Sequence, residues 1–223
     1  MKSLWRIVLI LTVYVSIIHS LSAQNNEWHK DRKTTLLFGL TQPLLLKGFN
    51  VEANYIHNRL IFDYSHGASL EFGGNLLPDY LEGQGVVVYL PFSTGFGVGY
   101  RFTQWLNLRV EPKWHRFEFY YANDVQNANN IIAVDANNYS IGLGLYGNYQ
   151  PFKRKDSFLT GITIAPSIRF WPTIASGFEG NSFRYDNKRT GKMEELKTLG
   201  SGIGFSPLVL NVSIGYTFNL KKS

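Results

Sequence analysis

The sequence predicts an all-β fold: a membrane-spanning, antiparallel up-and-down β-barrel, with eight strands as the simplest count. Apolar and polar residues alternate with a period of two along most of the chain, which is typical of strands. The alternating segments reach roughly ten residues, the length of a tilted membrane strand rather than the five or six usual in soluble sheets. Short and long connections also alternate, as in barrels that cross a membrane.

The first residues predict an exported protein. Residues 1–23 carry Lys2 and Arg6, continue with an apolar run from Ile7 to Ile18, and end in small residues at Ala23. The run is too short to span a bilayer comfortably, so this segment is a cleaved signal peptide rather than an anchor. No later stretch is long and apolar enough for a membrane helix, so any span must be made of strands.

The predicted strands follow one another through the rest of the chain. They cover residues 34–42, 49–57, 59–72, 93–102, 106–114, 139–149, 158–171 and 208–218. In RLIFDYSHGASLEF, residues 59–72, the apolar set runs from Leu60 to Phe72 and the opposite set includes Asp63 and Glu71. Pro112 and Pro166 fall inside strands and lack the N–H that a ladder needs, so we expect β-bulges there.

Alternation alone also fits a soluble sandwich, but the residue types on each face favour a membrane barrel. The polar faces are rich in Gly, Ser, Thr and Asn, with few of the long side chains that cover a soluble sheet. The apolar faces carry aromatic residues near the strand ends, as interface girdles do. These are Tyr55, Phe72, Tyr100, Phe102, Trp114, Tyr139, Tyr149, Phe158, Phe170, Tyr216 and Phe218. The apolar face should therefore contact lipid.

With short turns near 57–59, 103–105 and 151–157 and long loops near 73–92, 122–137 and 173–206, the chain resembles the small eight-stranded bacterial outer-membrane barrels, of the OmpA transmembrane-domain and OmpX kind. The resemblance covers nearly all of the mature sequence and lies in pattern and loop rhythm, without a diagnostic motif. Such barrels often end on an aromatic residue, whereas Phe218 is followed here by five residues.

The resemblance implies a place in the cell envelope, in the outer membrane of a two-membrane bacterium. Residues 24–33 would then be a periplasmic segment, 34–220 the barrel and 221–223 a tail, with the long loops outside the cell. The implied partners are outer-membrane lipid, lipopolysaccharide and the barrel-assembly machinery.

The inward faces predict a filled polar lumen, because an eight-stranded barrel is only wide enough for its own side chains. A charge network should form from Glu52, Asp63, Glu71, Arg101, Arg109, Glu111, Lys113 and Arg169. We expect Gly95, Gly97 and Gly99 to lie across from the long side chains of the next strand. The alternative interpretation of these charges is a narrow gated channel for small solutes or ions.

Other chemistries receive little support. The chain has no cysteine, and its net charge of +6 in an exported protein does not indicate nucleic-acid binding. A lipid A-modifying hydrolase would need a His and a Ser on one strand face, but parity places His66 outward and Ser65 and Ser69 inward. His29, His57 and His115 are dispersed, and the Asn-rich residues 122–138 lack calcium-loop spacing, so no metal, cofactor or enzymatic activity is expected.

The predicted function is a structural or binding component that acts through its external loops. Residues 76–92 are unusually apolar for a loop, which favours a protein partner or a folded cap, although Val86 to Val88 could instead extend the fourth strand. Residues 181–200 predict a hairpin that turns at 189–191. Its basic side chains are candidate contacts for lipopolysaccharide phosphates or a partner: Arg184, Lys188, Arg189 and Lys192.

Overall fold

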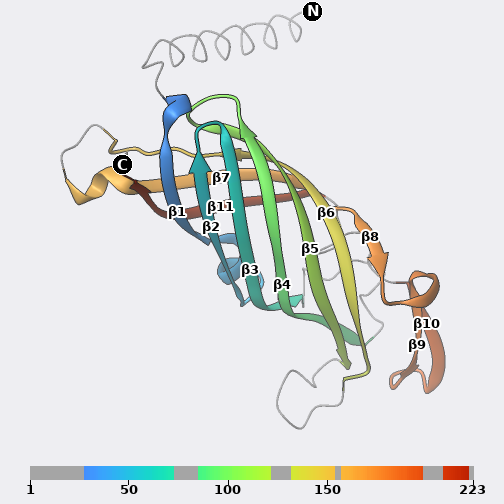
Figure 1. The fold of residues 1–223 in the computed structure, drawn as a ribbon. Helices are drawn as coiled ribbons and strands as arrows, with labels where there is room; N and C mark the ends of the chain where they lie inside the picture. The colour runs from blue at the N-terminus through green and yellow to red at the C-terminus, as the bar shows by residue number, and fades with distance from the viewer. Residues whose placement is uncertain (1–27, 73–84, 122–131, 154–156, 198–207, 221–223) are drawn as a thin grey trace, which may run out of the picture.

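Eight antiparallel strands form a closed ring, shown in Figure 1. The computed structural model describes residues 28–72, 85–121, 132–153, 157–197 and 208–220. The ring consists of β1 (Arg32–Gly39), β2 (Phe49–His57), β3 (Leu60–Phe72), β4 (Val86–Arg101), β5 (Leu106–Tyr121), β6 (Val134–Gly147), β7 (Ile162–Phe170) and β11 (Leu208–Asn219). Neighbours along the chain pair with each other, and the pairing of β1 with β11 closes the circuit. The prediction of an eight-stranded antiparallel barrel is confirmed.

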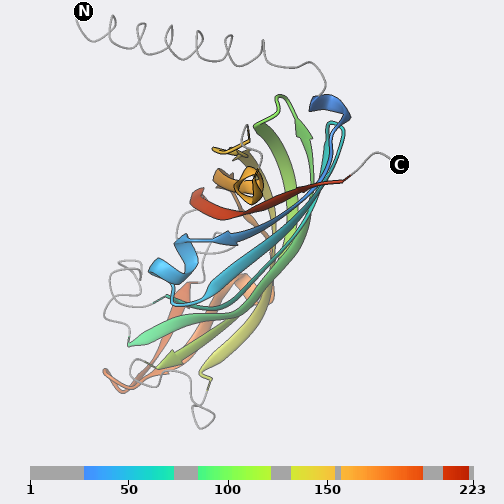
Figure 2. The same cartoon turned by 90° about the vertical axis from the view of Figure 1, so that its left-hand side faces the viewer.

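The two ends of the ring differ, and we name them for what they carry. The terminal end holds the short turns and both ends of the described chain, where Leu220 N–H donates to the Arg32 carbonyl at 2.9 Å. The 3-10 helices η1 (Trp28–Lys30) and η3 (Phe158–Gly161) also lie there, while the loop end carries the helix α2 (Thr41–Leu45). Figure 2 shows η1 at one end of the long strands and α2 toward the other.

Beyond the ring, the segment after β7 folds on itself at the loop end. It contains β8 (Thr173–Ser176), which pairs with β6, the 3-10 helix η4 (Glu179–Asn181), and the hairpin of β9 (Ser182–Asn187) and β10 (Lys192–Lys197) (Figure 1). The hairpin turns at residues 188–191, which include the predicted turn at 189–191.

Among the described residues, none of the helices has the length and apolar character needed to cross a membrane.

Burial alternates along the strands in the sense expected for a membrane barrel. Outward-facing Phe62, Val98 and Val110 are 43%, 55% and 47% exposed, whereas inward-facing Asp63 and Glu111 are 5% and 0% exposed. A soluble barrel would have the opposite polarity, because apolar side chains leave water when a soluble chain folds. The apolar outer surface therefore matches lipid surroundings, as predicted from the sequence.

Near the loop end, β3 and β4 each reverse which of their two faces points into the barrel. The sequence pattern did not predict this reversal. Leu70 and Phe72 were expected outward but are only 3% and 6% exposed. The change occurs at Ser69, whose positive φ of 57° breaks the regular pleat. Glu71 consequently turns away from the lumen, and Phe72 is not part of an aromatic girdle.

The prolines do not produce the predicted bulges. The β7–β11 register passes through Pro166 unchanged, and the β4–β5 register is the same on both sides of Pro112. An extended residue directs its N–H toward one neighbouring strand only, so a proline removes bonds on one side without requiring an extra residue. The register shift of β4 against β5 instead lies between Tyr89 and Ser93, the stretch that contains Pro91.

Three strands extend beyond their predicted limits. β4 begins at Val86, β5 continues to Tyr121 and β6 begins at Val134, so the predicted loops 73–92 and 122–137 are partly strand. β1 begins at Arg32, inside the segment expected to precede the barrel, and residues 158–161 are 3-10 helix rather than strand. The signal peptide, the tail and residues 73–84, 122–131 and 198–207 lie outside the described residues.

Candidate functional site: the polar lumen and its two ends

The Arg109 guanidinium is central to the lumen. Its Nη1 lies 2.6 Å from Glu52 Oε1 and 3.4 Å from Asp63 Oδ2, and it donates to Asn54 Oδ1 at 2.8 Å. Its Nε donates to Asn107 Oδ1 at 2.7 Å. Arginine suits this position because its planar group offers five donors and keeps its charge when buried. One side chain thereby links β5 to β2 and β3 across the barrel.

Two inward aromatic rings complete the network around the cations. Arg109 and Arg169 lie 4.1 and 4.7 Å from the centre of the Tyr146 ring. Lys113 and Arg169 lie 4.1 and 5.1 Å from the centre of the Trp171 ring. Cations over aromatic faces are attracted by the ring quadrupole, and more strongly where water is excluded. The rings thus contact these three cations of the lumen and stabilise each of them.

Glycines on β6 make room for these rings. A Cβ at Gly142 would overlap the Trp171 indole, and a Cβ at Gly144 would overlap the Tyr146 ring. Small residues opposite large ones fill a narrow lumen without strain. The predicted opposition of β4 glycines to β5 is also seen, since Gly95 pairs with Lys113 and Gly99 with Arg109.

The charges in the middle of the lumen balance. Glu52, Asp63 and Glu111 face Arg109, Lys113 and Arg169, with Arg169 Nη2 lying 3.5 Å from Glu52 Oε2. The Tyr146 hydroxyl donates a hydrogen bond to Glu111 Oε2, and Lys113 donates to Ser65 Oγ at 2.6 Å. We call these six charged residues and Tyr146 and Trp171 the lumen network. Such pairing offsets the cost of removing charges from water.

Some polar atoms of the lumen have no hydrogen-bond partner. Among the described residues they include Asn54 Nδ2, Asp63 Oδ1, Glu111 Oε1 and Trp171 Nε1. Buried polar atoms are normally paired with protein or with ordered water. The lumen therefore retains some hydrogen-bonding capacity.

A histidine lies between the lumen network and the loop end. The two ring nitrogens of His115 lie 2.8 Å from Ser93 Oγ and 2.7 Å from Ser140 Oγ, which ties β5 to β4 and β6. Both serines are buried, so the imidazole is held on both sides in the interior of the barrel. The arrangement positions the ring rather than exposing a nucleophile.

A buried apolar cluster, which we call the loop-end plug, lies at the loop end. Phe119 lies 4.6 Å from Phe183 and 5.8 Å from Phe178, between ring centres. The plug consists of Leu70, Phe72, Val86, Val88, Leu90, Phe117, Phe119, Phe178, Phe183, Tyr185 and Leu196. It joins the extended strands β3, β4 and β5 to the β9–β10 hairpin. The apolar segment at 86–90 is therefore both strand and cap.

A different set of contacts lies at the terminal end, around Arg101. Arg101 donates to the carbonyls of Trp28, Asn58 and Gln104 at 3.2, 3.0 and 3.2 Å, and its Nη2 lies 3.3 Å from Asp31 Oδ2. Its guanidinium also lies 5.1 Å from the Trp28 ring centre. Arg101 thus ties the segment before β1 to the β2–β3 and β4–β5 turns.

The structure brings together six of the eight residues predicted to form the charge network. Arg101 faces inward but belongs to the terminal end. Glu71 is a correction: it bonds Lys47 at 2.8 Å outside the lumen, because β3 changes face at Ser69. Sequence reasoning missed Tyr146 and Trp171 as members. The available signal was the pair of inward glycines at 142 and 144, which leave space for a neighbouring ring.

The predicted basic contacts are exposed on the β9–β10 hairpin. Arg184, Lys188, Arg189 and Lys192 are all exposed, and the Lys188 ammonium lies 4.0 Å from the Tyr121 ring centre. They lie along one hairpin rather than converging on a single point.

The prediction that His66 faces outward while Ser65 and Ser69 face inward holds for His66 and Ser65 but not for Ser69. His66 is partly buried on the outer face and its Nδ1 has no hydrogen-bond partner, while Ser65 faces the lumen. Ser69 is exposed rather than inward. Among the described residues, no three acidic, histidine or cysteine side chains are grouped so that they could hold a metal ion.

Comparison with known proteins finds solved structures that are similar in fold, but no match in sequence. No protein-family model and no curated protein matches the chain. A major outer membrane protein from Thermus thermophilus is 12% identical, with a TM-score of 0.43, over 84% of this chain and 98% of that one. The N-terminal β-barrel domain of Pseudomonas aeruginosa OprF is 13% identical, with a TM-score of 0.39, over 85% and 98%. Ail of Yersinia pestis is 12% identical, with a TM-score of 0.40, over 84% and 99%.

Proposed function

We propose that this protein is an outer-membrane β-barrel with a side-chain-filled lumen, which acts as a structural or binding component through its external surface. The observation that carries the proposal is the lumen network, in which Arg109 bridges two carboxylates and Tyr146 lies between two guanidiniums. The terminal end would face the periplasm and the loop end the outside of the cell.

The filled lumen opposes conduction at three successive levels. An ion entering from outside would have to displace the loop-end plug, which is apolar and offers no replacement for its hydration shell. It would next have to separate Arg109 from Glu52 and Asp63, and breaking a buried pair costs about 3–5 kcal/mol. The Arg101 contacts follow at the terminal end.

A narrow channel is the second candidate, because the lumen contains polar atoms without partners. Asp63 Oδ1 and Glu111 Oε1 belong to inward carboxylates and could bind water along a path. Water bridging can replace a direct hydrogen bond at little enthalpic cost.

Single-channel recording separates these two functions. The mature chain, refolded into vesicles and then fused with a planar bilayer, should remain electrically silent while circular dichroism reports a β-sheet spectrum. Discrete conductance steps that change in Arg109→Ala or Glu111→Ala would support the channel and contradict the filled lumen. Lys47→Ala is the control, since this exposed lysine pairs with Glu71 outside the lumen.

The loop end is the proposed binding surface. The exposed basic residues of the hairpin provide charge for lipopolysaccharide phosphates, since Arg and Lys bind phosphate by charge-assisted hydrogen bonds. Met193, on the same hairpin, is 66% exposed and would suit an apolar contact with a protein partner.

A further inference from the structure

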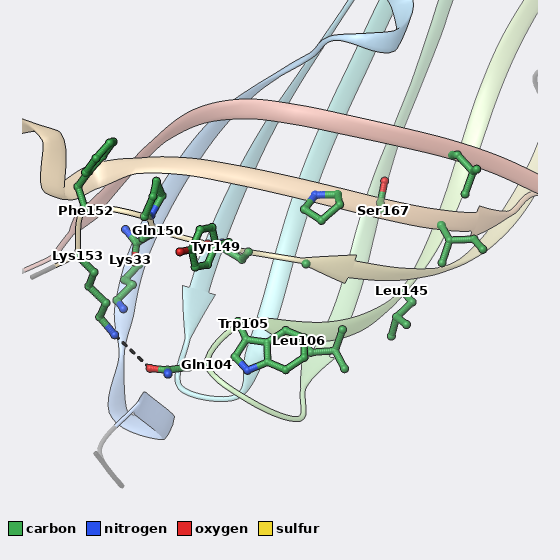
Figure 3. Close-up of a pocket in the computed structure, with 16 residues that line it drawn as sticks. Lys33, Gln104, Trp105, Leu106, Leu145, Tyr149, Gln150, Phe152, Lys153 and Ser167 are labelled. Carbon is green, nitrogen blue, oxygen red and sulfur yellow. Dashed lines mark hydrogen bonds between the residues drawn. The ribbon is translucent and has the colours of Figure 1, made fainter. Parts of the chain in front are cut away.

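A cavity of about 940 Å³ lies in the wall at the terminal end, next to the lumen network. Figure 3 shows Lys33, Lys153 and Gln104 at one end of it and Leu145 at the other. The volume falls within the range typical of small-molecule sites. The cavity therefore has room for an elongated ligand with one polar end.

The cavity lies where the ladder between β6 and β7 is interrupted. Their pairing covers only four positions, from Leu143 with Phe170 to Tyr146 with Ser167. It returns as a single bridge between Tyr149 and Ile164. Pro166, which lies next to the last paired position on β7, has no N–H to donate. The two strands thus lack backbone hydrogen bonds here, although they stay in contact, since a Cβ at Gly147 would lie 2.9 Å from Pro166 Cγ.

The apolar end of the cavity belongs to the lipid-facing surface. Leu145, Ile168 and Leu210 line the cavity and are 40%, 42% and 66% exposed on the outer face. Because this face contacts the membrane interior, a hydrocarbon chain could enter the cavity laterally without crossing water.

The polar end carries excess positive charge. Asp31 Oδ2 lies 2.8 Å from Lys33 Nζ and 3.3 Å from Arg101 Nη2, so one carboxylate serves two cations. Lys153 is a third cation beside them, and its Nζ donates to the neutral Gln104 Oε1 at 3.2 Å. Desolvation, with Lys33 as a second cause, lowers the pKa of Lys153. Among the described residues in these contacts, three cations face one carboxylate, which leaves an excess of two positive charges.

We propose that this cavity binds a phospholipid of the periplasmic leaflet with an anionic headgroup, its phosphate beside Lys33 and Lys153 and one acyl chain along Leu145, Ile168 and Leu210. The match rests on three features: a stretch of wall without backbone hydrogen bonds, an apolar lining exposed on the outer face, and a cationic end near the terminal-end turns. This site is distinct from the external surface of the proposed function, and it adjoins the lumen network at Ser167, which accepts from Arg169 Nε at 3.0 Å.

Lipid retention measured by native mass spectrometry tests the site. The refolded barrel would be released from micelles containing either phosphatidylglycerol or phosphatidylcholine, and bound lipids counted. We expect one phosphatidylglycerol to be retained in preference to phosphatidylcholine. Lys33→Gln and Lys153→Gln should each reduce this preference, by up to about fivefold for the loss of one ion pair with the headgroup. Lys30→Gln is the control, since Lys30 is exposed and does not line the cavity.

A second pair of variants tests the apolar end without altering charge. Leu145→Trp should fill the cavity and abolish selective retention. Leu143→Trp, two residues away on the same outer face and outside the cavity lining, should retain the lipid as the parent does. Faster migration of unheated samples in detergent gels would show that each variant is folded. Equal retention by both tryptophan variants, or an unchanged preference in both lysine variants, would overturn the proposal.

Discussion

At the scale of single residues, Arg109 should contribute more to the stability of the lumen network than any single carboxylate does. It is within ion-pair distance of Glu52 and Asp63, and it contacts the Tyr146 ring. Arg109→Met keeps much of the side-chain length but removes the charge. Asp63 would then lose its ion pair, and Glu52 would keep only Arg169 at 3.5 Å. We expect a loss of about 3–5 kcal/mol in the free energy of unfolding, measured by urea titration in lipid vesicles.

The reason for this loss can be checked with a second substitution. Glu52→Gln added to Arg109→Met removes one of the carboxylates left without its partner, so the double variant should regain part of the stability. A double variant as unstable as the sum of its parts would show that Arg109 acts through packing alone.

At the scale of elements, the strands were predictable where burial follows a regular period and not where the backbone breaks it. The faces of β2 and of most of β5 and β6 follow strict alternation. Leu70 and Phe72 were misplaced because the positive φ of Ser69 leaves no mark in the hydrophobic pattern. Glu71 failed as a lumen residue for the same reason. Tyr146 and Trp171 could not be assigned cation contacts, because these depend on packing across the barrel between distant strands.

The hairpin of β9 and β10 should be held to the barrel by its apolar face. Phe183 lies 4.6 Å from Phe119 and 5.4 Å from Phe178, between ring centres. Phe183→Asp would place a charge within the loop-end plug, and an unpaired buried charge is strongly unfavourable. We expect the hairpin to detach while the ring stays folded. Trypsin should then cut at Arg184, Lys188, Arg189 or Lys192 much faster in intact vesicles.

A matched control is present on the same hairpin. Met193→Asp adds the same charge at a side chain that is 66% exposed and outside the plug. Trypsin should cleave this variant at the parent rate. Equal acceleration in both variants would mean that charge on the hairpin, rather than release from the plug, controls cleavage.

At the scale of the whole molecule, the inverted polarity of the barrel determines where charge is tolerated. Val110 and Phe218 both face outward and are both 47% exposed. Their exposure alone would therefore predict the same effect of a charged substitution at either position. Val110 lies within the apolar band of β5, between Leu108 and Trp114, whereas Phe218 lies next to the last residue of β11 at the terminal end. In a membrane these two positions differ in depth.

Depth should therefore separate two otherwise equivalent substitutions. An arginine near the bilayer midplane of a barrel costs about 2–4 kcal/mol, falling to about 0–1 kcal/mol near the interface. Val110→Arg should accordingly lower the free energy of unfolding in lipid vesicles by several times as much as Phe218→Arg. Urea titration of both variants in the same vesicles measures the difference. Equal small losses would mean that the apolar outer face does not lie in hydrocarbon, and the membrane-spanning orientation would be wrong.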